Sequence, residues 1–415
     1  MYIEEMCATT DICLCWNEID FKKAERHVKK LQKRIALAYI THRYDVVMNL
    51  QHKMIHSLYA KALAVRCVVS NKGKYTPGID NVVWNTSDEK VIAIFMLKRR
   101  GYKASPLRRI YIPKGNGKYR PLSIPTMHDR AMQTLYKFAL EPIAEISADE
   151  HSYGFRPNRS VRDAIIHCCN ILEDNSLNWI LKVDIKSCFD NISHEWILEH
   201  IFMDKKILYE FLKCSYMENS ITYPIEKGVP QGGPISNIIC NMTLDGLEKL
   251  LCEKSNGIHM IRYADDIMVI GSCEKELVQY IVPIIEEFLH ERGLELAKEK
   301  TSISHIEQGV AFLGWKLRRE RGRIISTPTR KSIDSLLYKI ERVLTKRYLM
   351  YEEKCFVIKP IINGWVNFYR GVTPKQTLLG VECEVVLLLN RLGHDDIVGY
   401  ANILFAKQIH IYERW

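Results

Sequence analysis

The chain has 415 residues, 47% of them hydrophobic, and a formal net charge of +10 at pH 7. This length and apolar content exclude a disordered chain and allow two or three subdomains with a true core. No apolar run approaches the length of a membrane helix, and the N-terminus lacks the basic segment of a secretory signal, so we expect a cytoplasmic protein without membrane contact. The 13 cysteines show no zinc-finger spacing, which predicts reduced, mostly buried thiols.

Residues 20 to about 70 are predicted to form two or three helices, because apolar residues such as Val28, Leu31 and Ile35 recur at helical spacing. Gly73 and Pro77-Gly78 end this region. The strand-like residues 108–113 and the glycines that follow them then predict a basic hairpin of the kind that closes over a phosphate-bearing ligand.

The basic residues concentrate in two regions of the chain. Residues 98–120 carry nine Lys or Arg and no acid, and residues 316–370 carry fourteen basic and five acidic side chains. Two basic surfaces around an acidic centre suit a channel that binds phosphate backbones. Charge runs are more often simply solvated faces, so charge alone does not decide between these interpretations.

The middle of the chain alternates predicted helices and strands, which is typical of the α+β class. Helices are expected over residues 131–146, 161–172 and 194–202. The apolar strand 179–185 carries a single acid, Asp184, near its end. In the C-terminal part, residues 330–347 predict a basic amphipathic helix, a further helix is expected to start at Ile361, and residues 385–389 predict an apolar helix.

Tyr263-Ala264-Asp265-Asp266 lies between short apolar runs and predicts a β-hairpin with two adjacent carboxylates. An Asp pair alone is usually a solvated turn. Acids projecting from a buried sheet need a cation, however, and hard oxygen ligands on rigid elements suit a pair of Mg²⁺ ions that act on phosphates. Asp184, Asp265 and Asp266 are therefore the predicted metal ligands, although Asp266 is expected on the other side of the strand from Asp265.

The order of these parts resembles that of the reverse transcriptases, and among them the group II intron type. The parts are, in order, Lys114 to Arg120, Asp184, the Pro230–Pro234 turn, the Tyr263–Asp266 hairpin, Lys300 and Phe312–Trp315. Residues 31–35, 76–80, 120–125 and 152–157 match as well, so the resemblance extends to about residue 370. It implies a right-hand polymerase with an N-terminal extension and fingers (1–135), a palm with remaining fingers elements (136–325), and a helical thumb with a short C-terminal extension (326–415).

The resemblance also implies roles for individual residues. Catalysis is assigned to the three acids, which would hold two Mg²⁺ ions. It is also assigned to Lys300, which matches the family's lysine that can protonate departing pyrophosphate. The alternative interpretation of Lys300 is an ordinary lysine at a helix end, close to Lys298. Deoxynucleotide (dNTP) binding is assigned to five residues, of which Ile185 is also placed at the metal: Lys114, Arg120, Ile185, Phe189 and Gln231. Template and primer sites are assigned to Gly232, Gly233, Tyr263, Gly314 and Trp315, of which Trp315 is implied to be the rigid apolar support of the hairpin that grips the primer end.

Phe189 matches the family's position beside the sugar of the incoming nucleotide and predicts which sugar the enzyme accepts. A bulky ring at the matched position leaves no room for a 2′-hydroxyl, so the product strand should be DNA made on an RNA template. A buried Phe is ordinarily only core, and basic hairpin residues such as Arg120 are ordinarily solvated, so both interpretations depend on the resemblance.

Polymerase and non-catalytic RNA-binding protein are the two functional classes to separate, and the acids favour a polymerase. After residue 370 only 45 residues remain, with four basic and five acidic side chains. Intron-encoded relatives normally continue there with a basic DNA-binding segment. We therefore expect a free-standing antiviral defence enzyme that copies a dedicated, structured non-coding RNA. The alternative is a group II intron-encoded reverse transcriptase and maturase that binds intron RNA and assists splicing or retrohoming.

Overall fold

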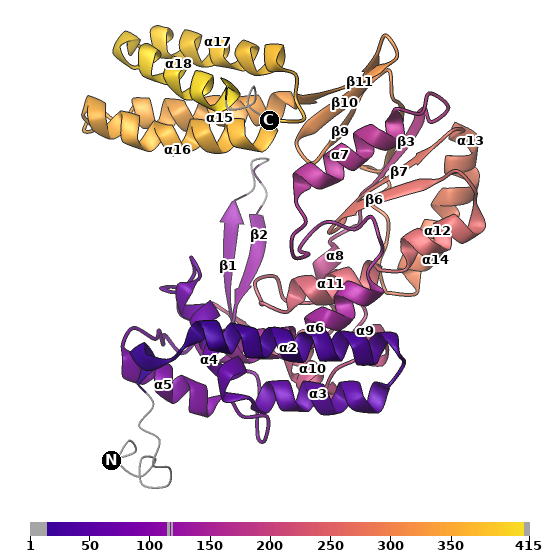
Figure 1. The fold of residues 1–415 in the computed structure, drawn as a ribbon, viewed down its shortest axis with the longest axis vertical. Coiled ribbons are helices and arrows are strands. Elements are labelled where there is room, and N and C mark those ends of the chain that lie inside the picture. Colours follow the sequence, from indigo (N-terminus) through magenta and orange to yellow (C-terminus); the bar gives the residue numbers. More distant parts are fainter. Residues whose placement is uncertain (1–14, 114–116, 118, 411–415) are drawn as a thin grey trace. The chain divides into compact units, whose positions relative to one another are not determined.

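The computed structural model describes residues 15–113, 117 and 119–410 (Figure 1). The chain divides into two compact units that interleave along the sequence. Unit 1 comprises Met1–Glu150, Ile185–Leu247 and Glu286–Glu295, and unit 2 comprises His151–Asp184, Glu248–Ile285 and Leu296–Trp415. The residues predicted as palm are thus divided, with the helices that follow Asp184 in unit 1 and the sheet that carries Asp184 in unit 2.

Unit 1 begins with a helical layer. Its helical elements are η1 (Trp16–Glu18), α2 (Phe21–Ile40), α3 (Tyr44–His56), α4 (Leu58–Ser70), α5 (Ser87–Met96), α6 (Met127–Ser147), α8 (Cys188–Asn191), α9 (His194–His200), α10 (Lys205–Lys213) and α11 (Ser236–Leu244). On α2 the apolar residues Val28, Leu31 and Ile35, which recur at helical spacing, are buried, and α2 packs on α3, α4 and α6. The sequence predicts two or three helices between residue 20 and about residue 70, and the structure has three, α2, α3 and α4.

The strands of unit 1 form one sheet in the order β2-β1-β4-β5. They are β1 (Leu107–Pro113), β2 (Tyr119–Ile124), β4 (Tyr216–Glu218) and β5 (Ile221–Tyr223). The antiparallel pair β1–β2 is the predicted basic hairpin, and β4 joins β1 in parallel. Asp129, buried in the first turn of α6, fixes the base of this hairpin by accepting hydrogen bonds from Tyr102, Thr126 and the Ser105 amide.

Unit 2 contains an antiparallel sheet in the order β6-β7-β3-β8. The strands are β3 (Trp179–Val183), β6 (His259–Tyr263), β7 (Asp266–Gly271) and β8 (Ser302–His305). The other elements before the C-terminal region are α7 (Val161–Leu172), α12 (Leu247–Lys254), α13 (Glu274–Glu276), η2 (Leu277–Ile281) and α14 (Val282–His290), of which α12 and α14 run across the unit boundary. The middle of β7 is buried on both faces, which explains its unbroken apolar sequence.

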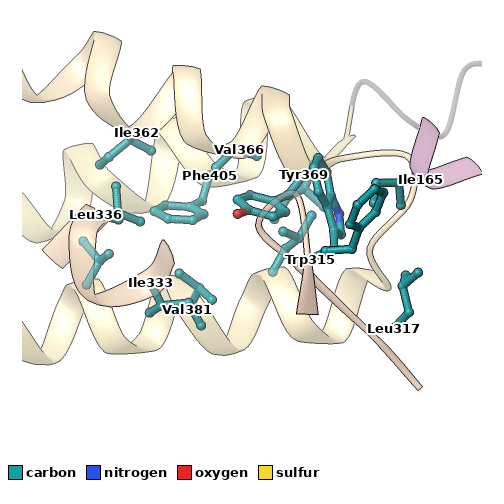
Figure 2. Close-up of a cluster of buried hydrophobic side chains, with 14 of the residues drawn as sticks. Ile165, Trp315, Leu317, Ile333, Leu336, Ile362, Val366, Tyr369, Val381 and Phe405 are labelled. Atoms are coloured by element: carbon teal, nitrogen blue, oxygen red, sulfur yellow. The ribbon is translucent and has the colours of Figure 1, made fainter. Parts of the chain in front are cut away.

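The rest of unit 2 is a three-stranded sheet, β9 (Val310–Phe312), β10 (Trp315–Glu320) and β11 (Arg323–Pro328), followed by a helical bundle. The helices are α15 (Arg330–Leu344), α16 (Tyr351–Tyr369), α17 (Lys375–Arg391) and α18 (Asp395–His410), which run side by side in Figure 1. Figure 2 shows their shared core, in which the Trp315 and Tyr369 rings lie 4.7 Å apart between centroids.

Two sequence expectations are wrong in detail. The helix expected to start at Ile361 starts ten residues earlier, because Pro360 lies inside α16 rather than before it. The thiols are not mostly buried: of the cysteines that the structure describes, none of which forms a disulfide, Cys67, Cys252, Cys273 and Cys383 are exposed and two more are only half-buried. None of the helices in the described ranges is long and apolar enough to span a membrane.

Candidate active site

The Tyr263–Asp266 segment is the tight hairpin that the sequence predicts. β6 and β7 pair up to Tyr263 opposite Asp266, which leaves Ala264 and Asp265 as the two turn residues. Ala264 has a φ of +58°, in the left-handed region that such turns require. Asp265 is half-buried and Asp266 is exposed, whereas Tyr263 packs against the core of unit 2.

Asp184 lies beside this hairpin. β3 pairs with β7 up to Val183 opposite Ile267, so the next residue, Asp184, comes level with Asp266. Its backbone is held by the Ala297 amide, which donates to the Asp184 carbonyl at 2.8 Å. The ammonium group of Lys300 lies 3.0 Å from its carboxylate. Unit 2 thus brings together all four residues that the sequence assigns to catalysis.

The charges at this edge favour a cation. Although Asp266 is exposed as a residue, neighbouring atoms remove part of the hydration of its carboxylate, and this loss together with the negative charges of Asp265 and Asp184 raises its pKa against the opposing charge of Lys182. Hydrogen bonding and charge from Asp184 raise the pKa of Lys300. Oxygen donors that repel one another in this way are chemically suited to Mg²⁺. Within the described residues no group of three or more His, Cys, Asp and Glu side chains is arranged to hold a metal, so the ligand roles stay a prediction.

Gly154 supports the hairpin and was not assigned a role from the sequence. The Tyr153 amide donates to the Arg262 carbonyl at 2.8 Å, and the Arg262 amide donates to His151. A Cβ at Gly154 would lie 2.3 Å from the Ala264 amide nitrogen, which is not possible without moving the turn. The segment 151–154 therefore packs directly against the turn that carries Asp265.

Unit 1 contains a cavity of about 460 Å³. Phe189, Asp190 and Gln231 line it, together with Arg109 and Tyr216, which sequence reasoning missed. The Arg109 guanidinium stacks over the Tyr216 ring at 3.9 Å from the centroid. Phe189 is 6% exposed, so its ring forms part of the wall rather than projecting into solvent.

A chain of hydrogen bonds orients Gln231 at this cavity. Arg120 Nε donates to Gln231 Oε1 at 2.7 Å, and Gln231 Nε2 donates to Asp190 Oδ1 at 3.4 Å. Arg120 and Gln231, separated by 111 residues, are therefore neighbours as the resemblance implies. Asp190 is the missed member, and only its place next to Phe189 could have pointed to it. Lys114 lies outside the described residues.

The glycine-rich turn is fixed by internal contacts. Gly232 has a φ of +118°, and a Cβ there would lie 2.6 Å from the Ser123 carbonyl oxygen. The Ser123 amide donates to the Gln231 carbonyl at 2.8 Å, so the turn is bound to β2. Gly233 is buried and Ile185 is 4% exposed. Because an isoleucine side chain has no ligand atom, Ile185 could serve a metal or nucleotide only through its backbone.

Gly314 and Trp315 belong to the turn between β9 and β10. Leu313 and Gly314 both have positive φ, as a two-residue turn between paired Phe312 and Trp315 requires. The Tyr369 hydroxyl donates to the Gly314 carbonyl at 3.0 Å. Trp315 is fully buried, so it can support a primer-contacting turn but cannot itself touch a primer.

Comparison with known proteins identifies the family. Residues 112–317 match the family described as reverse transcriptase (RNA-dependent DNA polymerase), and residues 16–97 match the N-terminal domain of reverse transcriptase. Protein YkfC of Escherichia coli is 31% identical over 339 residues, which cover 67% of this chain and 88% of that protein. The chain belongs to the reverse transcriptase family. It is an RNA-directed DNA polymerase with the right-hand polymerase fold, as the sequence predicts.

Two further relatives of this reverse transcriptase are intron proteins by name. Group II intron-encoded protein LtrA of Lactococcus lactis is 27% identical, over 79% of this chain and 66% of LtrA. The putative COX1/OXI3 intron 2 protein of Saccharomyces cerevisiae is 28% identical, over 64% of this chain and 38% of that protein. The chain therefore spans less than two thirds of these intron-encoded relatives. Apo telomerase from Candida tropicalis is similar in structure, with 14% identity and a TM-score of 0.44 over 75% of this chain and 67% of that chain.

Proposed function

We propose that Asp184, Asp265 and Asp266 hold two Mg²⁺ ions that this enzyme uses to extend DNA on an RNA template. The convergence of these acids at one sheet edge, with Asp184 level with Asp266, carries the proposal. Bound Mg²⁺ would supply the charge that makes the primer 3′-hydroxyl acidic and neutralises the triphosphate. Lys300 Nζ, beside Asp184, would carry the proton that departing pyrophosphate takes up.

The nucleotide would be recognised by residues of unit 1. Arg120, with Lys114, would contact triphosphate oxygens, since a guanidinium offers a fork of donors to phosphate. Gln231, oriented by Arg120 and Asp190, would contact the nucleotide, and the Phe189 ring would exclude a 2′-hydroxyl. The backbones at Ile185, Gly232 and Gly233, the Tyr263 side chain and the Gly314 turn supported by Trp315 would complete the contacts to nucleotide, template and primer.

The test is synthesis of complementary DNA by purified protein with an RNA template, a primer, dNTPs and Mg²⁺. Asp265→Asn is expected to lower the rate by at least about three powers of ten, because a neutral amide binds the metal poorly against water. Asp174→Asn removes a carboxylate from the same unit outside the site and should leave the rate unchanged. Full activity of Asp184→Ala or Asp265→Asn would refute the ligand assignment.

For the cellular role, we propose antiviral defence by copying a structured non-coding RNA. In support, α17 and α18 pack into the core of the bundle, and residues 371–415 are slightly acidic and poorly suited to a DNA backbone. The similarity to LtrA favours a second candidate, an intron-encoded enzyme that binds intron RNA and assists splicing or retrohoming.

Sequencing of the RNA that co-purifies from cells separates the two roles. A short structured transcript, complementary DNA copied from it, and phage protection that Asp265→Asn abolishes are expected for defence. Recovery of a large self-splicing intron RNA whose splicing survives Asp265→Asn would refute the defence role and favour the maturase.

A further inference from the structure

Unit 1 contains two adjoining pockets away from the proposed nucleotide cavity. The first, of about 550 Å³, lies between α3, α6 and the segment that leads into α10. The second, of about 630 Å³, lies on the other side of α10's first turn. Three cationic residues line both pockets and form the ridge between them: Arg99, Lys205 and Lys206.

Each pocket offers an aromatic ring. In the first, Phe202 is half-buried and its backbone carbonyl is held by Gln51 Nε2 at 3.0 Å, so the loop that presents it is anchored to α3. In the second, Tyr209 is 50% exposed. Flat rings that are anchored but accessible are suitable surfaces for stacking unpaired bases.

The first pocket also contains polar groups on an otherwise apolar wall. Tyr136 lines it and is 4% exposed, and its hydroxyl has no hydrogen-bond partner among the residues described. Buried hydroxyls normally have a partner, so an occupant with a polar edge suits this wall better than a purely apolar one. Arg99 is paired with Asp204, and Lys205 Nζ donates to the Glu199 and Ile201 carbonyls at 3.2 and 2.7 Å, which leaves Lys206 as the exposed cation of the ridge.

We propose that these pockets bind a single-stranded segment of the enzyme's RNA, with bases against Phe202 and Tyr209 and the intervening phosphate on Lys206, the exposed cation of the ridge. The alternation of ring, cation and ring matches the alternation of base, phosphate and base in an unpaired strand. This RNA site is additional to the polymerase site and anchors part of the RNA that is not being copied. The inference rests on the enzyme's use of RNA and not on the proposed cellular role.

The test uses a fluorescein-labelled ten-residue oligouridine that carries one 4-thiouridine, with the full-length protein in 0.1 M salt. Lys206→Glu is expected to weaken binding about tenfold, which corresponds to about 1.4 kcal/mol. Lys53→Glu is the control, because it makes the same charge reversal at an exposed position of α3 outside the pocket lining. It should change the affinity for the RNA less than about twofold if the position of the charge, and not the net charge of the protein, determines binding. Phe202→Leu should weaken binding several-fold, and Phe202→Tyr, which keeps a ring, should restore it.

Photocrosslinking of the same RNA should label peptides within residues 48–55 and 198–210. Equal losses in Lys206→Glu and Lys53→Glu, unchanged affinity in Phe202→Leu, or crosslinks confined to other segments would each overturn the inference. Thermal unfolding of each variant excludes misfolding as the cause of a loss. DNA synthesis on a primed template is measured separately, so its absence in the wild-type protein would contradict the proposed function and leave this binding result intact.

Discussion

Phe189→Ala is the sharpest test of how the enzyme selects its sugar. The ring is 6% exposed and lines the cavity of about 460 Å³ with Gln231, so its removal enlarges the cavity that we propose binds the nucleotide. A hydroxyl is close in size to a methylene, and pockets discriminate against one such group by about 1–3 kcal/mol, or roughly 10–200-fold. We therefore expect the ratio of kcat/KM for dNTP over ribonucleotide to fall by roughly that factor, with dNTP use partly retained.

The assay is single-nucleotide primer extension on an RNA template, with dNTP and ribonucleotide titrated separately. Loss of a buried Phe also costs about 3–5 kcal/mol of folding stability, so a stability-matched control is needed. Phe211→Ala removes an equally buried ring from α10 of the same unit without touching this cavity. An unchanged ratio in Phe189→Ala, or an equal change in Phe211→Ala, would refute the proposed sugar selection.

Two further predictions concern stability. Trp315→Ala should lower the free energy of unfolding by about 3–5 kcal/mol in urea titrations, because the fully buried ring packs against Phe368 and Tyr369; a loss below about 1 kcal/mol would contradict its role in the core. Burial alone would raise the pKa of Asp129, but the nearby His128 ring, whose Nδ1 lies 3.9 Å from Oδ1, and hydrogen bonds from Thr126 and Tyr102 outweigh it and hold the pKa below its usual value. Its stabilisation should therefore be complete above the unfolded pKa of about 3.9 and disappear as pH falls through the folded pKa. Asp129→Asn should cost about 1.5–3 kcal/mol at pH 7, and the difference from wild type should shrink towards pH 3; a pH-independent difference would show that the charge is irrelevant.

The parts of the fold that depend on local pattern could be predicted from the sequence. The Tyr263–Asp266 turn lies between apolar runs that only a buried sheet explains, and the β1–β2 hairpin follows from its flanking strands and glycines. The start of α16 could not be placed as well, because a proline is uncommon inside a helix, so Pro360 gives no sign that the helix begins at Tyr351. In this helix it lies in the interior, ten residues after the Met350 cap.

The contacts that organise the candidate site could not be predicted in the same way, because they join residues far apart in the chain. Arg120 donates a hydrogen bond to Gln231, 111 residues further along the chain. Gly154 lies so close to the Ala264 backbone that a Cβ would not fit, and no periodic pattern in the sequence predicts this contact. The family resemblance assigns Arg120 and Gln231 to the same nucleotide site, but it gives no role to Asp190 or Gly154. Asp190 accepts a hydrogen bond from Gln231, and Gly154 packs against the turn at Ala264.

The burial of Trp315 is compatible with the supporting role that the resemblance implies for it. The ring is enclosed by the rings of α16, while the preceding Gly314 carbonyl accepts a hydrogen bond from the Tyr369 hydroxyl. The turn is thereby tied to the helical bundle, so a shift of α16 would be transmitted to the backbone at Gly314. A primer contact at this turn would then depend on the packing of the bundle core, and substitutions at Tyr369 should affect primer use although Tyr369 itself lies in that core.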